Sequence, residues 1–166
     1  KDGKNTSITG GNISIKDKDN NNSTSIGINN VTLKDKDGNT STLTADKSEL
    51  KDKAGNTNTN TSTTNVLKDT NGNTNTSTAA GTTYTDKDAN KTVVGPKEIN
   101  ITDKSGDNTA SLTNKDLILN AKDPKTGVDK TSHVSGDKIA FTTTDEIEKV
   151  VDKDGKPVID PTTGKQ

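Results

Sequence analysis

A 17-residue repeat is the feature that most constrains the fold of this chain. Aspartates recur with this period through five units, and an apolar residue lies two positions before each of them. The aspartates are Asp35, Asp52, Asp69, Asp86 and Asp103, and the apolar column is Leu33, Leu50, Leu67, Tyr84 and Ile101. A small residue follows each aspartate after three positions, at Gly38, Gly55, Gly72, Ala89 and Gly106. A fixed period of this kind predicts one structural unit repeated along the chain.

Each unit predicts two short strands and two turns. Polar and apolar residues alternate before each aspartate, as they do in a strand with two different faces. The run from Lys34 to Asn39 is typical of a tight turn, in which Gly38 supplies the positive φ. A second turn signal closes each unit, for example at Gly95-Pro96-Lys97. We expect an all-β, elongated repetitive structure, either a meander of hairpins or a β-roll or β-prism in which each unit forms one coil.

The composition excludes an ordinary globular core. Only 22% of the residues are hydrophobic and 1% are aromatic, against about 45–50% apolar residues in an average soluble domain. Burial of one leucine or isoleucine stabilises by about 1.5–3 kcal/mol, whereas ordering one repeat costs at least about 17 kcal/mol of backbone entropy. We therefore expect the apolar columns of three chains to meet around one axis, in a parallel homotrimer.

The chain divides into two regions by sequence register. Residues 1–120 hold seven units, because the apolar column extends to Ile15 and Ile118. From Ala121 the register is lost, and residues 121–166 are expected to form a transition segment. Within it the sequence predicts a loop at 121–135, a strand at 138–142, a short helix at 144–151 with Thr144 as its N-cap, and a turn and tail at 153–166.

Candidate chemical sites are better explained by structural roles. The Asp-x-Asp-x-Asn run from Asp35 resembles the first ligands of a calcium loop, but Thr40 and Asp46 stand where that loop needs Gly and Glu. Turn chemistry accounts for the same residues. His133 is the only histidine, and the chain offers no large apolar pocket to shift the pKa of paired carboxylates. We expect no metal, no cofactor and no enzymatic activity.

The basic residues predict no nucleic-acid partner. All 23 of them are lysines, and they alternate with aspartates in runs such as Lys34 to Asp37. We expect this interleaving to leave no cationic stripe for a phosphate backbone, and almost no aromatic rings are present to stack on bases. No stretch reaches the roughly 20 apolar residues of a membrane helix, so we also expect no direct membrane insertion of this segment.

The repeats resemble those in the passenger domains of trimeric autotransporter adhesins of Gram-negative bacteria. The units at 31–44 and 99–112 carry the resemblance, which covers roughly residues 7–126. It implies a homotrimer that projects extracellularly and is anchored in the outer membrane through regions outside this chain. It also implies attachment to a host receptor, such as a CEACAM-type molecule, or to extracellular matrix, together with autoaggregation. The chain lacks the coiled-coil heptads of the family and the Ser-Val-Ala-Ile-Gly type repeat of its β-roll heads.

Three functional hypotheses remain open at this point. In the first, the segment is an adhesive head whose loops contact a receptor, and the candidate receptor-binding residues are Pro96, Lys97, Glu98, Lys125 and His133. In the second, it is a passive spacer, because the Thr/Asn surface between Thr57 and Thr78 offers few residues typical of binding hot spots. The third is a monomeric, wall-anchored fibrillar repeat of a Gram-positive bacterium.

Overall fold

The computed structural model describes residues 3–143, and all regular structure within them is β-strand. The chain falls into two compact units, Lys1–Pro96 and Lys97–Gln166. The all-β, repetitive fold predicted from the sequence is confirmed. The helix predicted at 144–151 lies outside the described residues, and so does the tail at 153–166. None of the described residues belongs to a helix long and apolar enough to span a membrane.

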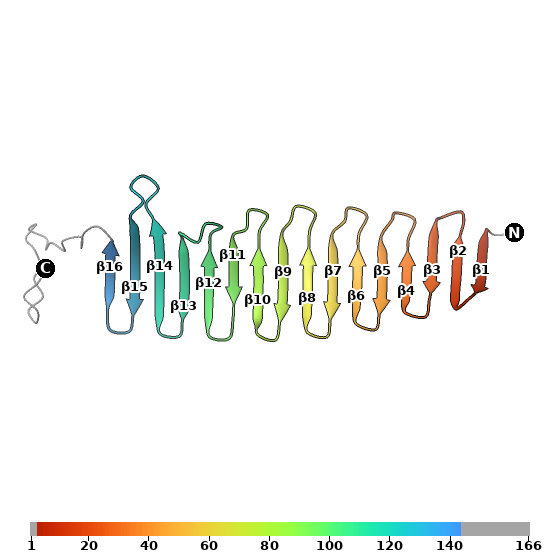
Figure 1. The fold of residues 1–166 in the computed structure, drawn as a ribbon, viewed down its shortest axis with the longest axis horizontal. Coiled ribbons are helices and arrows are strands. Elements are labelled where there is room, and N and C mark those ends of the chain that lie inside the picture. Colours follow the sequence, from red (N-terminus) through yellow and green to blue (C-terminus); the bar gives the residue numbers. More distant parts are fainter. Residues whose placement is uncertain (1–2, 144–166) are drawn as a thin grey trace, which may run out of the picture. The chain divides into compact units, whose positions relative to one another are not determined.

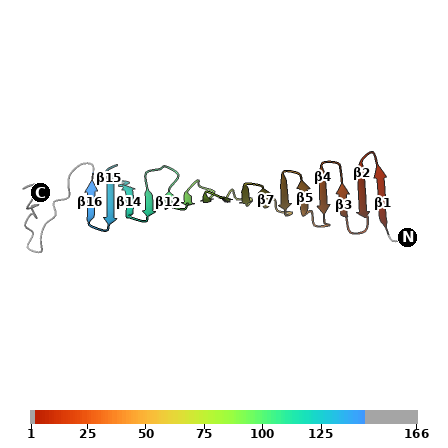
Figure 2. The ribbon, with the colours of Figure 1, turned by 90° about the horizontal axis from the view of Figure 1, so that it is seen from below.

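In the first unit, eleven strands form one antiparallel meander (Figure 1). Each strand pairs with its neighbours in the chain, so the order in the sheet is the order in the sequence. The strands are β1 (Lys4–Thr9), β2 (Asn12–Asp17), β3 (Asn22–Ile26), β4 (Asn30–Lys34), β5 (Thr40–Thr44), β6 (Lys47–Lys51), β7 (Thr57–Thr61), β8 (Thr64–Lys68), β9 (Thr74–Thr78), β10 (Gly81–Thr85) and β11 (Lys91–Val94). Of the two predicted connectivities the meander is confirmed, and the β-roll is wrong. Figure 2 shows this unit as a single layer whose strands turn progressively from β1 past β7, which is the usual twist of a sheet.

The second unit contains five strands in the same meander connectivity. They are β12 (Glu98–Thr102), β13 (Thr109–Thr113), β14 (Asp116–Lys122), β15 (Asp129–Ser135) and β16 (Ile139–Thr143). The strand predicted at 138–142 is confirmed by β16. The division of the chain at residue 120 describes sequence register, and it stays a prediction.

The loop predicted over residues 121–135 is wrong for most of its length. Only residues 123–128 connect β14 to β15, and Thr131 to Val134 pair with β14 along its length. Threonine and valine favour the extended backbone of a strand. Pro124 and Gly127, whose φ is 73°, therefore mark a short connection and not the end of the sheet.

The turns between β4 and β11 follow the 17-residue period. The Asp35 N–H donates to the Asn39 carbonyl at 3.1 Å, and the Gly38 N–H donates to the Asp35 carbonyl at 3.2 Å. The same two bonds recur in the turns at Asp52, Asp69 and Asp86. Gly38 has a φ of 93°, which confirms the left-handed conformation expected at this position.

Ala89 occupies the turn position that is glycine in the other units, and its φ is 68°. A left-handed backbone costs a residue with a Cβ about 1–2 kcal/mol, while glycine costs about 0.5–1 kcal/mol in conformational entropy. We expect Ala89→Gly to raise the free energy of unfolding by about 0.5 kcal/mol, measured by urea denaturation. Gly72, at the equivalent position with a φ of 95°, supplies the reverse test, since Gly72→Ala should lower stability. A less stable Ala89→Gly variant would contradict this account.

No side chain among the described residues is buried. Each unit is one layer of strands, so both faces of the sheet meet solvent and no second layer creates an interior. Tyr84 is 47% exposed and Phe141 is 65% exposed within the single chain. The regular structure of the chain therefore depends on backbone hydrogen bonds, turn chemistry and cross-strand contacts.

Candidate functional site

One face of the first unit carries a continuous row of apolar side chains. The strand register aligns one residue from each successive strand, and a large side chain alternates with a small polar one. This apolar row consists of Ile15, Thr24, Leu33, Ser41, Leu50, Asn58, Leu67, Asn75 and Tyr84. Its five large side chains are 44–54% exposed. The predicted apolar column is thus a surface feature of the chain.

A shallow groove follows the apolar row. It has a volume of about 760 Å³ and is lined by Ile15, Leu33, Leu50 and Leu67 together with polar residues of the strands and turns. A second hollow of about 510 Å³ is lined by Leu67 and Tyr84. Contiguous apolar surface of this kind is typical of sites where a protein meets a partner.

The turns beside the apolar row are joined by a network that we call the Asp–Asn ladder. It consists of Asp35, Asn39, Asp52, Asn56, Asp69 and Asn73. In the second turn, Asp52 Oδ2 accepts from Asn56 Nδ2 at 2.7 Å and Asp52 Oδ1 accepts from the Asn56 N–H at 2.9 Å. Asn56 Oδ1 in turn accepts from the Thr70 N–H of the following turn at 3.0 Å. Asn39 and Asn73 make the equivalent bond to their following turns, so each turn fixes the next.

These hydrogen bonds lower the pKa of the ladder aspartates. The side-chain amide of the turn asparagine is the largest cause at Asp35, Asp52 and Asp69, and backbone amides add to it while desolvation opposes it. In the second unit, Asn108 and Ser105 lower the pKa of Asp103 to about 2. The ionised carboxylates therefore stabilise the folded turns.

The ladder predicts that the protein loses stability in acid. A carboxylate whose pKa is lowered on folding contributes fully above its unfolded pKa of about 3.9, and the contribution disappears as the pH falls through the folded pKa. We expect the melting temperature measured by circular dichroism to stay constant between pH 7 and pH 5. It should decrease once the pH is lower than about 4. Asp52→Asn should melt below wild type at pH 7, and the difference should shrink towards pH 2.5. A difference that stays constant over this range would show that the carboxylate charge contributes nothing.

The opposite face of the first unit carries a row of lysines. Neighbouring residues of a strand point to opposite faces, so Leu33 and Lys34, both in β4, lie on different sides of the sheet. The register then gathers the lysines of alternate strands into one line. This lysine row consists of Lys16, Ser23, Lys34, Thr40, Lys51, Thr57, Lys68, Thr74, Thr85 and Lys91. The prediction that interleaved charges leave no cationic stripe is therefore wrong, because these lysines lie in strands that the register aligns, whereas aspartates such as Asp35 lie in the turns.

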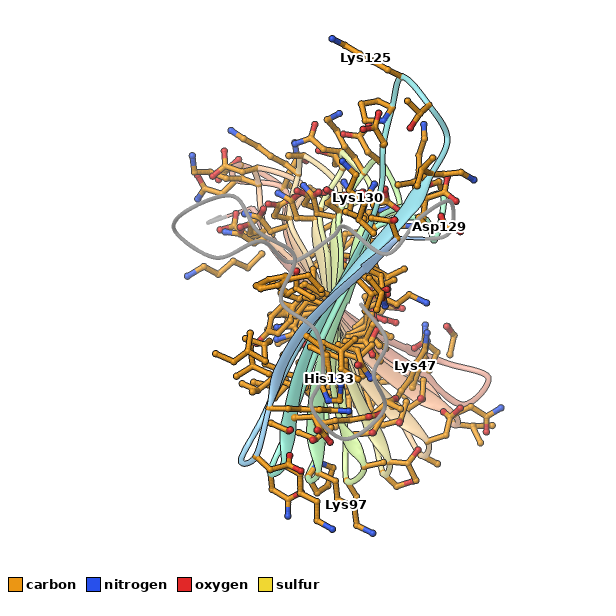
Figure 3. All side chains as sticks on the ribbon, turned by 90° about the vertical axis from the view of Figure 1, so that its left-hand side faces the viewer. Lys47, Lys97, Lys125, Asp129, Lys130 and His133 are labelled. Carbon is orange, nitrogen blue, oxygen red and sulfur yellow. The ribbon has the colours of Figure 1, made fainter. Side chains whose placement is uncertain are left out.

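The candidate receptor-binding residues do not form one site. Pro96 and Lys97 lie in the turn after β11, and Glu98 begins β12. Lys125 lies in the loop after β14, and Figure 3 shows it at the opposite end of the strands from Lys97.

His133 lies within β15, where its Nε2 is 2.7 Å from Asp116 Oδ1. The sequence did not predict this pairing, because it assigned the histidine to a loop. Both residues line a surface hollow of about 620 Å³ with Ser135 and Lys138. His133 is therefore a paired side chain of a strand, and a role in receptor contact stays a prediction.

Comparison with known proteins gives a likeness of fold only. No protein-family model and no curated protein matches the chain. The G-box domain of the microcephaly protein CPAP, whose structure suggested a role in centriole elongation, matches with a TM-score of 0.55 and 13% identity over 85% of this chain and 97% of that one. The TCP10 domain of Danio rerio CPAP, solved with a peptide of Danio rerio STIL, has a TM-score of 0.48 and 13% identity over 94% and 97% of the two chains. At this identity, the likeness to the G-box domain shows that the fold of this chain has a counterpart, and it extends to nothing else.

Proposed function

We propose that this chain is a segment of a bacterial cell-surface adhesin of the trimeric autotransporter type. In this role it is extracellular, and regions outside the chain anchor it to the outer membrane. A strongly polar chain that gains two strands with every repeat, and that requires no buried core, suits a segment built by repetition. The role requires no catalysis and no cofactor.

The apolar row is the observation that carries this proposal. Its large side chains are about half exposed, and each of them is followed along the row by a small side chain. Around a three-fold axis the same row residue of each chain lies at the same level, so layers of large side chains alternate with layers of small ones. Three chains arranged in parallel around one axis would bury all three rows in a shared core without open-ended growth.

The mass of the chain in solution tests this assembly. One chain has a mass of 17.4 kDa, and a homotrimer has three times that mass. Light scattering of residues 1–166 after size-exclusion chromatography should give the trimer mass at micromolar concentration. A mass equal to that of one chain would contradict the trimer and would favour the monomeric wall-anchored repeat of a Gram-positive bacterium.

A passive spacer is the second candidate, and the surface of β7 to β9 favours it. These strands consist mainly of threonine, asparagine and serine, which are seldom binding hot spots. Binding of the isolated, correctly assembled chain to host cells or to matrix proteins separates the two candidates. Saturable binding supports an adhesin that contacts its receptor through this segment, and its absence supports the spacer.

A further inference from the structure

We propose that the lysine row of the first unit binds a linear sulfated polysaccharide, which lies across the strands. The lysines stand on β2, β4, β6, β8 and β11, and all five are exposed. Lysines on alternate strands are separated by two strand spacings, a distance of about 9.6 Å. The result is a line of positive charges that is regularly spaced from β2 to β8 and continues, after a gap on β10, to Lys91.

These lysines are available to an external partner. None of the five forms an ion pair within the described part of the chain. Glu49, which lies on the same face as Lys51, pairs with Lys47 at 3.3 Å. Turn hydrogen bonds from Asn39 and Asn56 hold the carboxylates of the ladder aspartates Asp35 and Asp52.

Hydroxyl groups separate the lysines within the row. Ser23, Thr40, Thr57 and Thr74 are the cross-strand partners on the intervening strands. Each hydroxyl can donate a hydrogen bond to a sulfate oxygen or accept one from a sugar hydroxyl. The row therefore alternates ionic and hydrogen-bonding groups, as the repeating charged units of a sulfated sugar chain require.

The start of the row widens into a hollow at the turns. Lys16, Lys18, Lys34 and Lys36 line a space of about 560 Å³, together with Asp17, Asp35 and Asp37. Lys36 forms an exposed ion pair with Asp37 at 3.5 Å. Exposed pairs of this kind are weak, so Lys36 can turn to an incoming sulfate at little cost.

The chemistry of this face favours a polysaccharide over other polyanions. Nucleic-acid strands gain affinity by stacking bases on aromatic rings, and the lysine row contains no aromatic residue. Tyr84 lies on the opposite face, in the apolar row. A folded acidic protein needs buried anchors at the centre of its interface, whereas this face offers mainly threonine and serine. A flexible charged polymer needs only the charge series and the hydroxyls.

This inference rests on the proposed function in one respect: an extracellular segment is exposed to sulfated polysaccharides. The lysine row and the apolar row lie on opposite faces, so assembly through the apolar row leaves the lysines accessible. Binding to the polymer and the mass of the assembly can therefore fail independently of each other.

The test compares two four-lysine variants of the full chain on immobilised heparin. The first replaces Lys34, Lys51, Lys68 and Lys91 with glutamine, and its matched control replaces Lys97, Lys115, Lys125 and Lys138. Both remove the same charge. Surface plasmon resonance should show at least tenfold weaker binding and a shallower salt dependence for the first variant, with the control within about twofold of wild type. A third variant, Thr85→Lys, fills the gap in the row on β10 and should bind about threefold tighter.

Circular dichroism and light scattering confirm that each variant keeps its fold and mass. Unsulfated hyaluronan and oligo-dT serve as competitors, and neither should displace heparin at equal charge. The proposal is overturned if wild type does not bind heparin, if both four-lysine variants lose the same affinity, or if oligo-dT competes as well as heparin. If the variant that replaces the four row lysines does not fold, the heparin affinity of Thr85→Lys alone tests the proposal. An affinity equal to that of wild type would then contradict binding by the lysine row.

Discussion

Replacing Gly81 with alanine is expected to destabilise the first unit by about 3 kcal/mol. Gly81 begins β10 with a φ of 145°, a conformation that residues with a Cβ rarely adopt. A Cβ placed there would lie well inside 3.0 Å of the Val94 carbonyl oxygen and 3.1 Å from the Gly95 Cα. Both obstacles are backbone atoms next to β10, so no side-chain rotation relieves the clash. The strand pairing itself must shift.

Urea denaturation followed by circular dichroism measures this loss. Gly136→Ala is the matched control, because no atom lies within 4 Å of the added Cβ and its φ is not in the positive range. The control should unfold within about 0.5 kcal/mol of wild type. A Gly81→Ala variant as stable as this control would mean that the pairing of β10 with β11 is wrong.

The second large effect is expected on assembly, from Leu50→Asp at the centre of the apolar row. Leu50 is 54% exposed in the chain, so burying the rest of it in an interface stabilises by about 1–1.5 kcal/mol, roughly half the value for a whole leucine. A trimer loses this contribution three times and also buries three carboxylates. We expect the association constant to fall by at least about 100-fold, with a shift to 17.4 kDa in light scattering.

Thr76→Asp provides the control for Leu50→Asp. Thr76 lies at the centre of β9, and its cross-strand partners are Val66 and Thr83 on the face opposite to the apolar row. The substitution adds the same charge to a central strand without touching the row. Assembly through the apolar row requires that Leu50→Asp dissociates while Thr76→Asp keeps the mass of wild type. Equal behaviour of the two variants would exclude the row as the interface.

Much of the fold could be predicted because the repeat controls it locally. The spacing from Asp35 to Asp52 contains two strands and two turns, and Gly38 adopts the positive φ that its position required. The choice between a meander and a β-roll could not be made from the sequence, since the same turn residues serve both. It depends on which strand each strand pairs with, and the alternation of residues within one strand carries no information about that.

The errors have a common physical cause. Lys34 and Asp35 are neighbours in the sequence, and their charges were expected to cancel locally. Lys34 ends β4 and Asp35 lies in the turn that follows, and the register lines up each lysine with that of the strand after next. The segment at 121–135 was assigned to a loop because Pro124 and Gly127 were given more weight than the strand-forming residues after them. Non-local pairing decided both cases.

The Asp–Asn ladder has a consequence for how such a chain can change in length. Because Asn56 bonds to the backbone of the following turn, as Asn39 does one unit earlier, any two units can meet at the same junction. Unequal recombination that adds or removes a whole repeat in phase would preserve the direction of the strands. It would also keep the apolar row and the lysine row on their own faces, and each asparagine would still bond to the following turn. An insertion of a single residue within a strand would instead exchange the lysine and apolar faces beyond it. Length variants in natural populations should therefore differ by whole repeats.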